Sequence, residues 1–223
     1  TGSGRPQEGL ALLQFALRTA IEHDKPSAAL RASYNLSDTL AQFDRYAEAC
    51  AVVRDGLAQS RRVGNRFWEL SFLGQLYPFF ASGEWDEALS MFGELPIDEW
   101  EQSRQAFVIG PLVQAGVGAL RGALDDARHN VERFRAMETS GDVYEKAARS
   151  SAQAFLLLAD GDLSGALAAA ESASSVTADF GYGSEVVKES FVIAGEASLA
   201  LDDRAKLEEL LAAVEALPPG RST

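Results

Sequence analysis

The chain has 223 residues, of which 47% are hydrophobic and 24% are charged, a composition that is typical of folded globular proteins and excludes disorder of the whole chain. Its formal net charge of -13 is opposite in sign to what binding to phosphates or to an anionic membrane surface requires, so we expect neither a nucleic-acid nor a membrane partner. The single cysteine, Cys50, excludes an internal disulfide and a cysteine-based metal cage, and we expect it to be a small buried residue.

The same features predict a cytoplasmic protein. No stretch approaches the roughly 20 apolar residues that a membrane span requires, and we expect no signal peptide. Residues 1–6 are interpreted as a linker or a cloning scar, and residues 218–223 as a tail.

Apolar residues then recur at helical spacing along the chain. Leu10, Leu13, Leu17 and Ile21 form one stripe, which predicts a lone helix over residues 7–23. No segment alternates as a strand does, so the sequence predicts an all-α fold of about eleven helices. After a turn at Lys25-Pro26-Ser27, we expect helix pairs at 27–42 with 45–63, 66–81 with 85–94, 98–121 with 123–139, 143–159 with 163–178, and 183–201 with 204–217.

These pairs follow an internal repeat. Ala49, Ala88, Ala127 and Ala166 are separated by three equal intervals of 39 residues. We interpret each alanine as the place where the two helices of a pair approach closely. The array would occupy residues 7–217, as a half repeat at 7–24 and repeats at about 27–64, 66–96, 98–140, 143–180 and 183–217, the last one degraded.

Each repeat alanine is preceded at the same distance by a residue suited to ending a helix. Gly83, Gly122 and Gly161 lie five residues before it, and Asp44 takes that place in the first copy. Glycine readily adopts the left-handed conformation in which many helices end. We therefore expect a tight turn between the two helices of each pair.

Two of these copies carry the motif of a known family. Tyr34-Asn35-Leu36 followed by Tyr46-Ala47-Glu48-Ala49, and Gly83-Glu84-Trp85-Asp86-Glu87-Ala88, resemble the tetratricopeptide consensus. The period exceeds the roughly 34 residues of the plain family. Two further stretches, residues 56–66 and 210–220, are similar to the C-terminal repeat region of large bacterial regulators that join an ATPase core to an adenylyl cyclase or a DNA-binding domain.

This resemblance implies a right-handed α-α superhelix that serves as a non-catalytic scaffold for protein interaction or effector sensing. It also implies a fragment of a larger cytoplasmic signalling or transcription regulator, whose partner is a protein or peptide. Apolar surface at the two ends of the array would make a homodimer possible.

The sequence lacks the common motifs of catalytic and cofactor sites. The sequence has no phosphate-binding P-loop motif, and the glycines of residues 116–122 lack the dinucleotide-binding spacing. Asp125 and Asp126 are followed by His129 where a third metal-binding carboxylate would stand. We therefore expect no catalytic residues, no metal and no cofactor, and the open alternative is a helical enzyme or small-molecule-binding domain with an unrecognised site.

A partner would bind the concave face, which the first helix of each pair lines in the resembled family. The opposing interpretation, that apolar residues at this spacing simply pack between helices, stays open for these positions. The aromatic cluster of residues 67–80 is expected to fill the seam between adjacent repeats, with a hydrophobic pocket for a small effector as the alternative. The residues that the resemblance places on this face are Arg31, Tyr34, Asp38, Leu73, Tyr77, Phe80, Leu112, Ser151 and Phe155.

Overall fold

The computed structural model describes residues 6–96 and 104–217 of the chain. Within these ranges every element of regular secondary structure is a helix, and eleven α-helices are at least eight residues long, which confirms the all-α prediction. The chain forms two compact units, Thr1–Phe107 and Val108–Thr223. The expected linker at 1–6 and tail at 218–223 lie almost entirely outside the described residues, and the right-handed path of the array stays a prediction.

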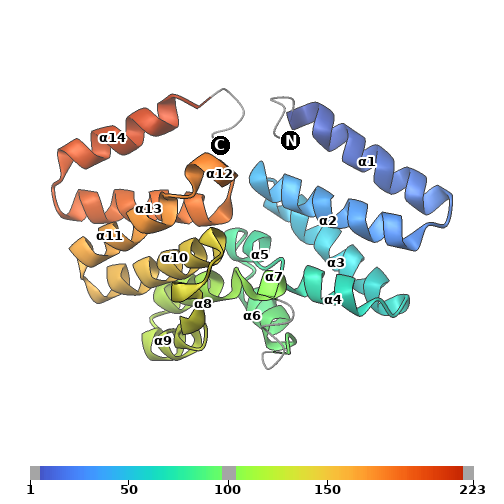
Figure 1. The fold of residues 1–223 in the computed structure, drawn as a ribbon, viewed down its shortest axis with the longest axis horizontal. Helices are drawn as coiled ribbons and strands as arrows, with labels where there is room; N and C mark the ends of the chain where they lie inside the picture. The colour runs from blue at the N-terminus through green and yellow to red at the C-terminus, as the bar shows by residue number, and fades with distance from the viewer. Residues whose placement is uncertain (1–5, 97–103, 218–223) are drawn as a thin grey trace. The chain divides into compact units, whose positions relative to one another are not determined.

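Unit 1 contains one helix followed by helix pairs (Figure 1). Helix α1 packs against α2, and α2 packs against α3. The following first helix is split into α4 and α5. The bounds are α1 Pro6–Glu22, α2 Pro26–Gln42, α3 Tyr46–Arg62, α4 Arg66–Leu73, α5 Tyr77–Ala81, α6 Trp85–Gly93 and α7 Arg104–Phe107.

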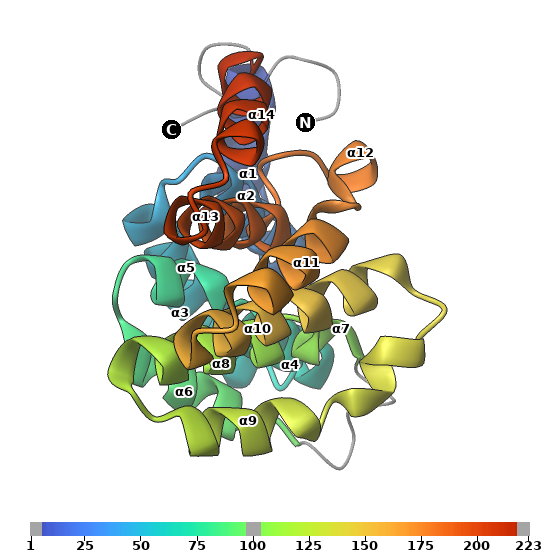
Figure 2. The same cartoon turned by 90° about the vertical axis from the view of Figure 1, so that its left-hand side faces the viewer.

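Unit 2 continues the same alternation, and Figure 2 shows α14 lying alongside α13, against which it packs. The predicted second helix at 123–139 ends early and continues as a 3-10 helix, η2, which buries Met137. The bounds are α8 Gly110–Arg121, α9 Leu124–Glu132, η2 Arg135–Thr139, α10 Val143–Asp160, α11 Leu163–Ser174, α12 Thr177–Phe180, α13 Glu185–Ala200 and α14 Arg204–Glu215.

The predicted turns between paired helices are confirmed. Asp44, Gly83, Gly122 and Gly161 all have positive φ angles, between 59° and 81°. The next residue in each case donates its N–H to a carbonyl five residues back, at 2.8–3.0 Å. This is the Schellman ending of a helix, which satisfies carbonyls that the helix leaves unpaired.

The four repeat alanines are buried, as their predicted place between paired helices requires. Ala49, Ala88, Ala127 and Ala166 are each at most 3% exposed. Ala127 lies so close to Gly118 of α8 that a Cβ at position 118 would collide with it. The small side chains therefore set the close approach of α8 and α9, and the glycines of residues 116–122 belong to helix packing.

Two predicted first helices are interrupted by proline. A proline cannot donate the helical hydrogen bond to the residue four positions earlier, and its ring clashes with that carbonyl. For Pro78 that residue is Gly74, which follows the last residue of α4, and for Pro111 it is Phe107, the last residue of α7. The expected unbroken helices at 66–81 and 98–121 are therefore wrong at these points, and the start of the second prediction, residues 98–103, lies outside the described residues.

The first three helices share a small apolar core. Leu10 of α1 is buried with Leu36, Leu40 and Ala49, and Leu13 and Leu17 pack against them. Ile21, the last member of the predicted stripe, is instead 61% exposed. The last turn of α1 thus buries the small Ala20 and leaves the larger Ile21 exposed.

Candidate partner-binding surface

Helix α2 carries the exposed part of the predicted surface. Pro26 occupies the first turn, where its missing N–H costs nothing, and the helix continues without interruption to Gln42. Arg31, Tyr34 and Asp38 lie three and four residues apart, so they share one face. Arg31 and Asp38 are exposed and Tyr34 is half-buried, so the structure brings these three predicted residues together.

Aromatic rings of α4 extend this face. The Tyr34 ring lies 5.7 Å from that of Trp68 and 6.0 Å from that of Phe72, measured between centroids. Trp68 is half-buried, and Phe67, whose ring is 5.1 Å from it, is 65% exposed. The expectation that the whole aromatic cluster fills a seam is therefore wrong for Phe67.

The turn between α4 and α5 holds α2 in place through hydrogen bonds of its residue Gln75. The Ser37 hydroxyl bonds to the Gln75 side-chain oxygen, and the Gln75 amide donates to the backbone carbonyl of Tyr34 at 3.3 Å. Ser37 also donates to the Tyr34 carbonyl at 2.9 Å. Because Ser37 is fully buried, these bonds hold the middle of α2 in a defined position.

A groove runs along α2 on its side facing α1. Its volume is about 420 Å³, which is within the range of small binding sites. We call it the α2 groove, and its lining residues are Leu13, Ala16, Ser27, Ala28, Arg31, Ala32 and Asn35.

The α2 groove combines an apolar floor with three exposed polar side chains, those of Ser27, Arg31 and Asn35. Leu13, Ala16 and Ala32 provide apolar surface from both helices. In the described part of the chain, no carboxylate lies within ion-pair distance of the Arg31 guanidinium, and no group bonds to the Asn35 amide. An exposed arginine beside apolar surface is a favourable anchor for a partner carboxylate.

Asp38 closes the polar edge of this face. Its carboxylate accepts a hydrogen bond of 2.9 Å from the Gln42 amide, one helical turn further on. The acidic and basic ends of the face, Asp38 and Arg31, are thus separated by the Tyr34 ring. A partner segment that carries both charges would therefore bind along α2 in a single orientation.

The remaining predicted residues are not on an accessible face. Each is at most 8% exposed, so it lies within the packed interior and offers a partner almost no contact area. We therefore correct their assignment from partner binding to helix packing. These six residues are Leu73, Tyr77, Phe80, Leu112, Ser151 and Phe155.

The sequence pattern did not predict that Leu13 and Ala16 contribute apolar surface to the groove, or that Asn35 contributes a polar group. Leu13 and Ala16 come from α1, which the repeat pattern counted as a half repeat without a binding role. Asn35 follows Arg31 by four residues, so helical spacing alone could have placed it on the same side of α2. Trp68 and Phe67 could not be separated from their buried neighbours by sequence.

Two groups that could carry chemistry, the Cys50 thiol and the Asp125 carboxylate, lie outside the α2 groove. Burial raises the pKa of the Cys50 thiol to about 11, and the fully buried sulfur lies 3.7 Å from the Ser82 hydroxyl. The thiolate is therefore a minor species at neutral pH. The Asp125 carboxylate forms an ion pair with Arg128, with 2.8 Å between the closest atoms.

Comparison with protein-family models gives no match for this chain, and comparison with curated protein sequences gives none either. In the ranges that the structure describes, no helix combines the length and the apolar character needed to cross a bilayer.

Proposed function

We propose that this chain is a non-catalytic protein-interaction scaffold of the tetratricopeptide-like kind, which binds a segment of a partner protein along the α2 groove. The observation that carries the proposal is Arg31, an exposed arginine without a carboxylate partner among the described residues, beside an apolar groove. The 39-residue helix-pair repeat supports the same class, because stacked repeats serve mainly as binding surfaces.

The groove defines the chemistry of the partner segment. A carboxylate of the segment would pair with Arg31, and a small aliphatic side chain would cover Leu13 and Ala16. The half-buried Trp68 and Tyr34 add aromatic area that loses little conformational entropy on binding. We therefore propose an acidic and aliphatic segment as the ligand of this surface.

The cellular setting follows from the resemblance. We propose that the chain belongs to a larger cytoplasmic signalling or transcription regulator, in which the repeat region receives the partner and other domains give the output. Exposed apolar side chains on the outer helices, Phe15 on α1 and Leu211 on α14, at 59% and 58% exposure, support the expectation that this region also self-associates.

A peptide selection tests the binding surface. A random peptide library is selected on the wild-type chain, and the peptides obtained are measured by fluorescence anisotropy. We expect Asp or Glu next to aliphatic residues, and an affinity that falls as salt is added. Arg31→Ala should weaken binding about tenfold, in line with the loss of one charged hydrogen-bonded contact.

A charge reversal provides the matched control. Arg31→Glu should abolish binding of the acidic peptide. The same variant should bind a peptide in which lysine replaces the acidic residue. Arg18→Glu makes the same charge change at an exposed position of α1 outside the groove and should leave binding unchanged. Selected peptides that bind the Arg31→Glu and wild-type chains equally would place the partner surface elsewhere.

A further inference from the structure

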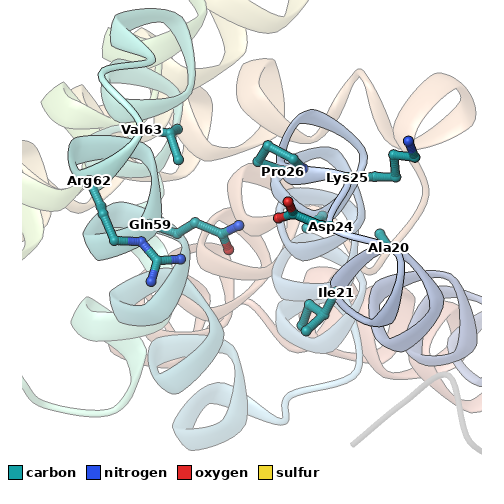
Figure 3. A pocket seen from close by; sticks show the side chains of 9 residues that line it. Ala20, Ile21, Asp24, Lys25, Pro26, Gln59, Arg62 and Val63 are labelled. Atoms are coloured by element: carbon teal, nitrogen blue, oxygen red, sulfur yellow. The ribbon is translucent and has the colours of Figure 1, made fainter.

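A second pocket lies in unit 1, on a different set of residues from the α2 groove. It has a volume of about 460 Å³ and is formed where the C-terminal ends of α1 and α3 meet the turn before α2 (Figure 3). No residue lines both pockets. The lining residues are Ala20, Ile21, Asp24, Lys25, Pro26, Ala29, Gln59, Arg62 and Val63, and we call this the turn pocket.

Opposite charges face the turn pocket from its two sides. Figure 3 shows the Arg62 guanidinium and the Gln59 amide reaching inward from α3, and the Asp24 carboxylate lying on the opposite side, while the Lys25 amine points away. Arg62 and Asp24 do not form an ion pair with each other. Within the described ranges neither of them has another charged partner, and the Gln59 amide has no bond.

The turn pocket also exposes large apolar side chains. Ile21 is 61% exposed and Val63 is 43% exposed, whereas Ala20 is buried. Covering such aliphatic surface is favourable by about 25 cal/mol for each Å² removed from water. A ligand that covers Ile21 and Val63 and pairs with both Asp24 and Arg62 would use the apolar surface and the two opposite charges that face the pocket.

We propose that the turn pocket binds a small zwitterion, an α-amino acid with an aliphatic side chain. Its carboxylate would pair with the Arg62 guanidinium, whose planar fork suits a carboxylate, and its ammonium would pair with Asp24. The Gln59 amide would bond to the carboxylate as well, and the aliphatic side chain would cover Ile21 and Val63.

The charge pattern favours a zwitterion over a simple anion. A monocarboxylate would pair with Arg62 but would also bring a second negative charge close to the exposed Asp24 carboxylate, and the repulsion between these like charges weakens binding. Multiple negative charge on the ligand would be opposed further by the net charge of -13 on the chain. This proposal therefore goes beyond protein binding and would give the scaffold an effector site.

The test uses three probes with the same branched aliphatic chain, titrated into the full chain of the protein and followed by heteronuclear NMR. L-leucine carries both charges, 4-methylpentanoate carries only the carboxylate, and isopentylamine carries only the ammonium. We expect L-leucine to bind with a millimolar or tighter dissociation constant and to shift the amides of Asp24 and Arg62. Each single-charge analogue should bind at least about tenfold more weakly, because one charged contact is lost.

Two variants assign the contacts. Arg62→Ala and Asp24→Asn should each weaken L-leucine about tenfold. Asn is chosen because Asp24 has a φ of 49°, and asparagine tolerates this left-handed conformation. The control is Arg133→Ala, an exposed arginine of unit 2, which should leave L-leucine binding unchanged.

Several outcomes would overturn the proposal. The first is an absence of amide shifts at about 20 mM L-leucine, a concentration that reveals even weak millimolar binding. The second is unchanged binding in both pocket variants, and the third is an analogue that binds as tightly as L-leucine. Because Arg31→Ala leaves the turn pocket intact, the peptide and amino-acid experiments can fail independently.

Discussion

Two first helices occupy the same place in the repeat and lie two 39-residue intervals apart in the sequence. One of them is continuous and the other is broken in its middle. Helix α10 in unit 2 runs without interruption through residues 143–160, while the matching residues 65–82 of unit 1 form α4 and α5 with a break between them. Both begin with a side-chain cap, from Asp142 and Asn65, and both lead to a glycine with positive φ, Gly161 and Gly83.

The difference is produced by two residues. Gly74 and Pro78 stand in unit 1 where Ala152 and Leu156 stand in α10. Pro78 cannot donate to the Gly74 carbonyl, and the N–H of Leu76 donates to it at 2.9 Å instead. The repeat therefore fixes the ends of a first helix, while individual residues decide whether its middle is continuous.

The largest expected effect comes from introducing the break into α10. Leu156→Pro should lower the free energy of unfolding by about 3 kcal/mol more than Leu156→Ala does, because proline removes a helical bond and clashes with the Ala152 carbonyl. The Ala variant is the control for the lost side chain, which is buried. Chemical denaturation followed by far-ultraviolet circular dichroism measures both values.

The reciprocal change should matter much less. Pro78→Leu restores the missing donor, but the chain at Gly74 is held in its bent path by packing against the backbone of Ala106. If Leu156→Pro proved no more harmful than Leu156→Ala, proline would not be the cause of the difference between the two helices.

The ends of the helices could be predicted because their signals are local. A left-handed residue at 44, 83, 122 or 161 and a small alanine five positions later depend on backbone conformation and side-chain size alone. The break at Gly74 depends also on Ala106, which is far away in the sequence. That contact has no local signal, whereas Pro78 is a local signal that the prediction of a continuous helix at 66–81 did not take into account.

The candidate sites show the same division. Arg31, Tyr34 and Asp38 could be placed on one face from their spacing within a single helix. Leu73 occupies the position of Tyr34 one interval later, yet it is fully buried because α3 and α7 pack around α4. The turn pocket draws Ile21, Asp24 and Arg62 from separate elements, which no periodicity relates.

The second prediction concerns the close approach at the break. In Gly74→Ala the new Cβ would lie 2.7 Å from the Cα of Ala106, so backbone must move, and we expect a loss of about 1–3 kcal/mol in the free energy of unfolding. Gly93→Ala is the matched control, because it lies in α6 of the same unit with open space around it.

The control should move in the opposite direction. Alanine favours the helical backbone over glycine, so Gly93→Ala should raise the free energy of unfolding by up to about 1 kcal/mol. Denaturant titrations of the two variants are read against the wild-type chain. Equal shifts at both positions would mean that Ala106 does not press on Gly74 in solution, and that the break is not held by packing.

The smallest expected effect tests what the break contributes to the α2 face. Because the chain bends after Gly74, the Gln75 side chain reaches the buried Ser37 and the Tyr34 carbonyl. Gln75→Ala should therefore cost about 1 kcal/mol of stability, the typical net value of such hydrogen bonds. Gln14→Ala, at an exposed position of α1, should stay within about 0.5 kcal/mol of wild type.

A double-mutant cycle with Ser37→Ala decides whether this contact is the reason. Coupling of at least about 0.5 kcal/mol between positions 37 and 75 is expected for side chains that bond directly. With such coupling, Gln75→Ala should also weaken the peptides selected on the α2 groove, since the middle of α2 loses its anchor. If the effects of the two substitutions on the free energy of unfolding are simply additive, the bend at Gly74 and Pro78 does not position α2. The orientation of Arg31 and Tyr34 is then set by the packing of α2 against α1 and α3 alone.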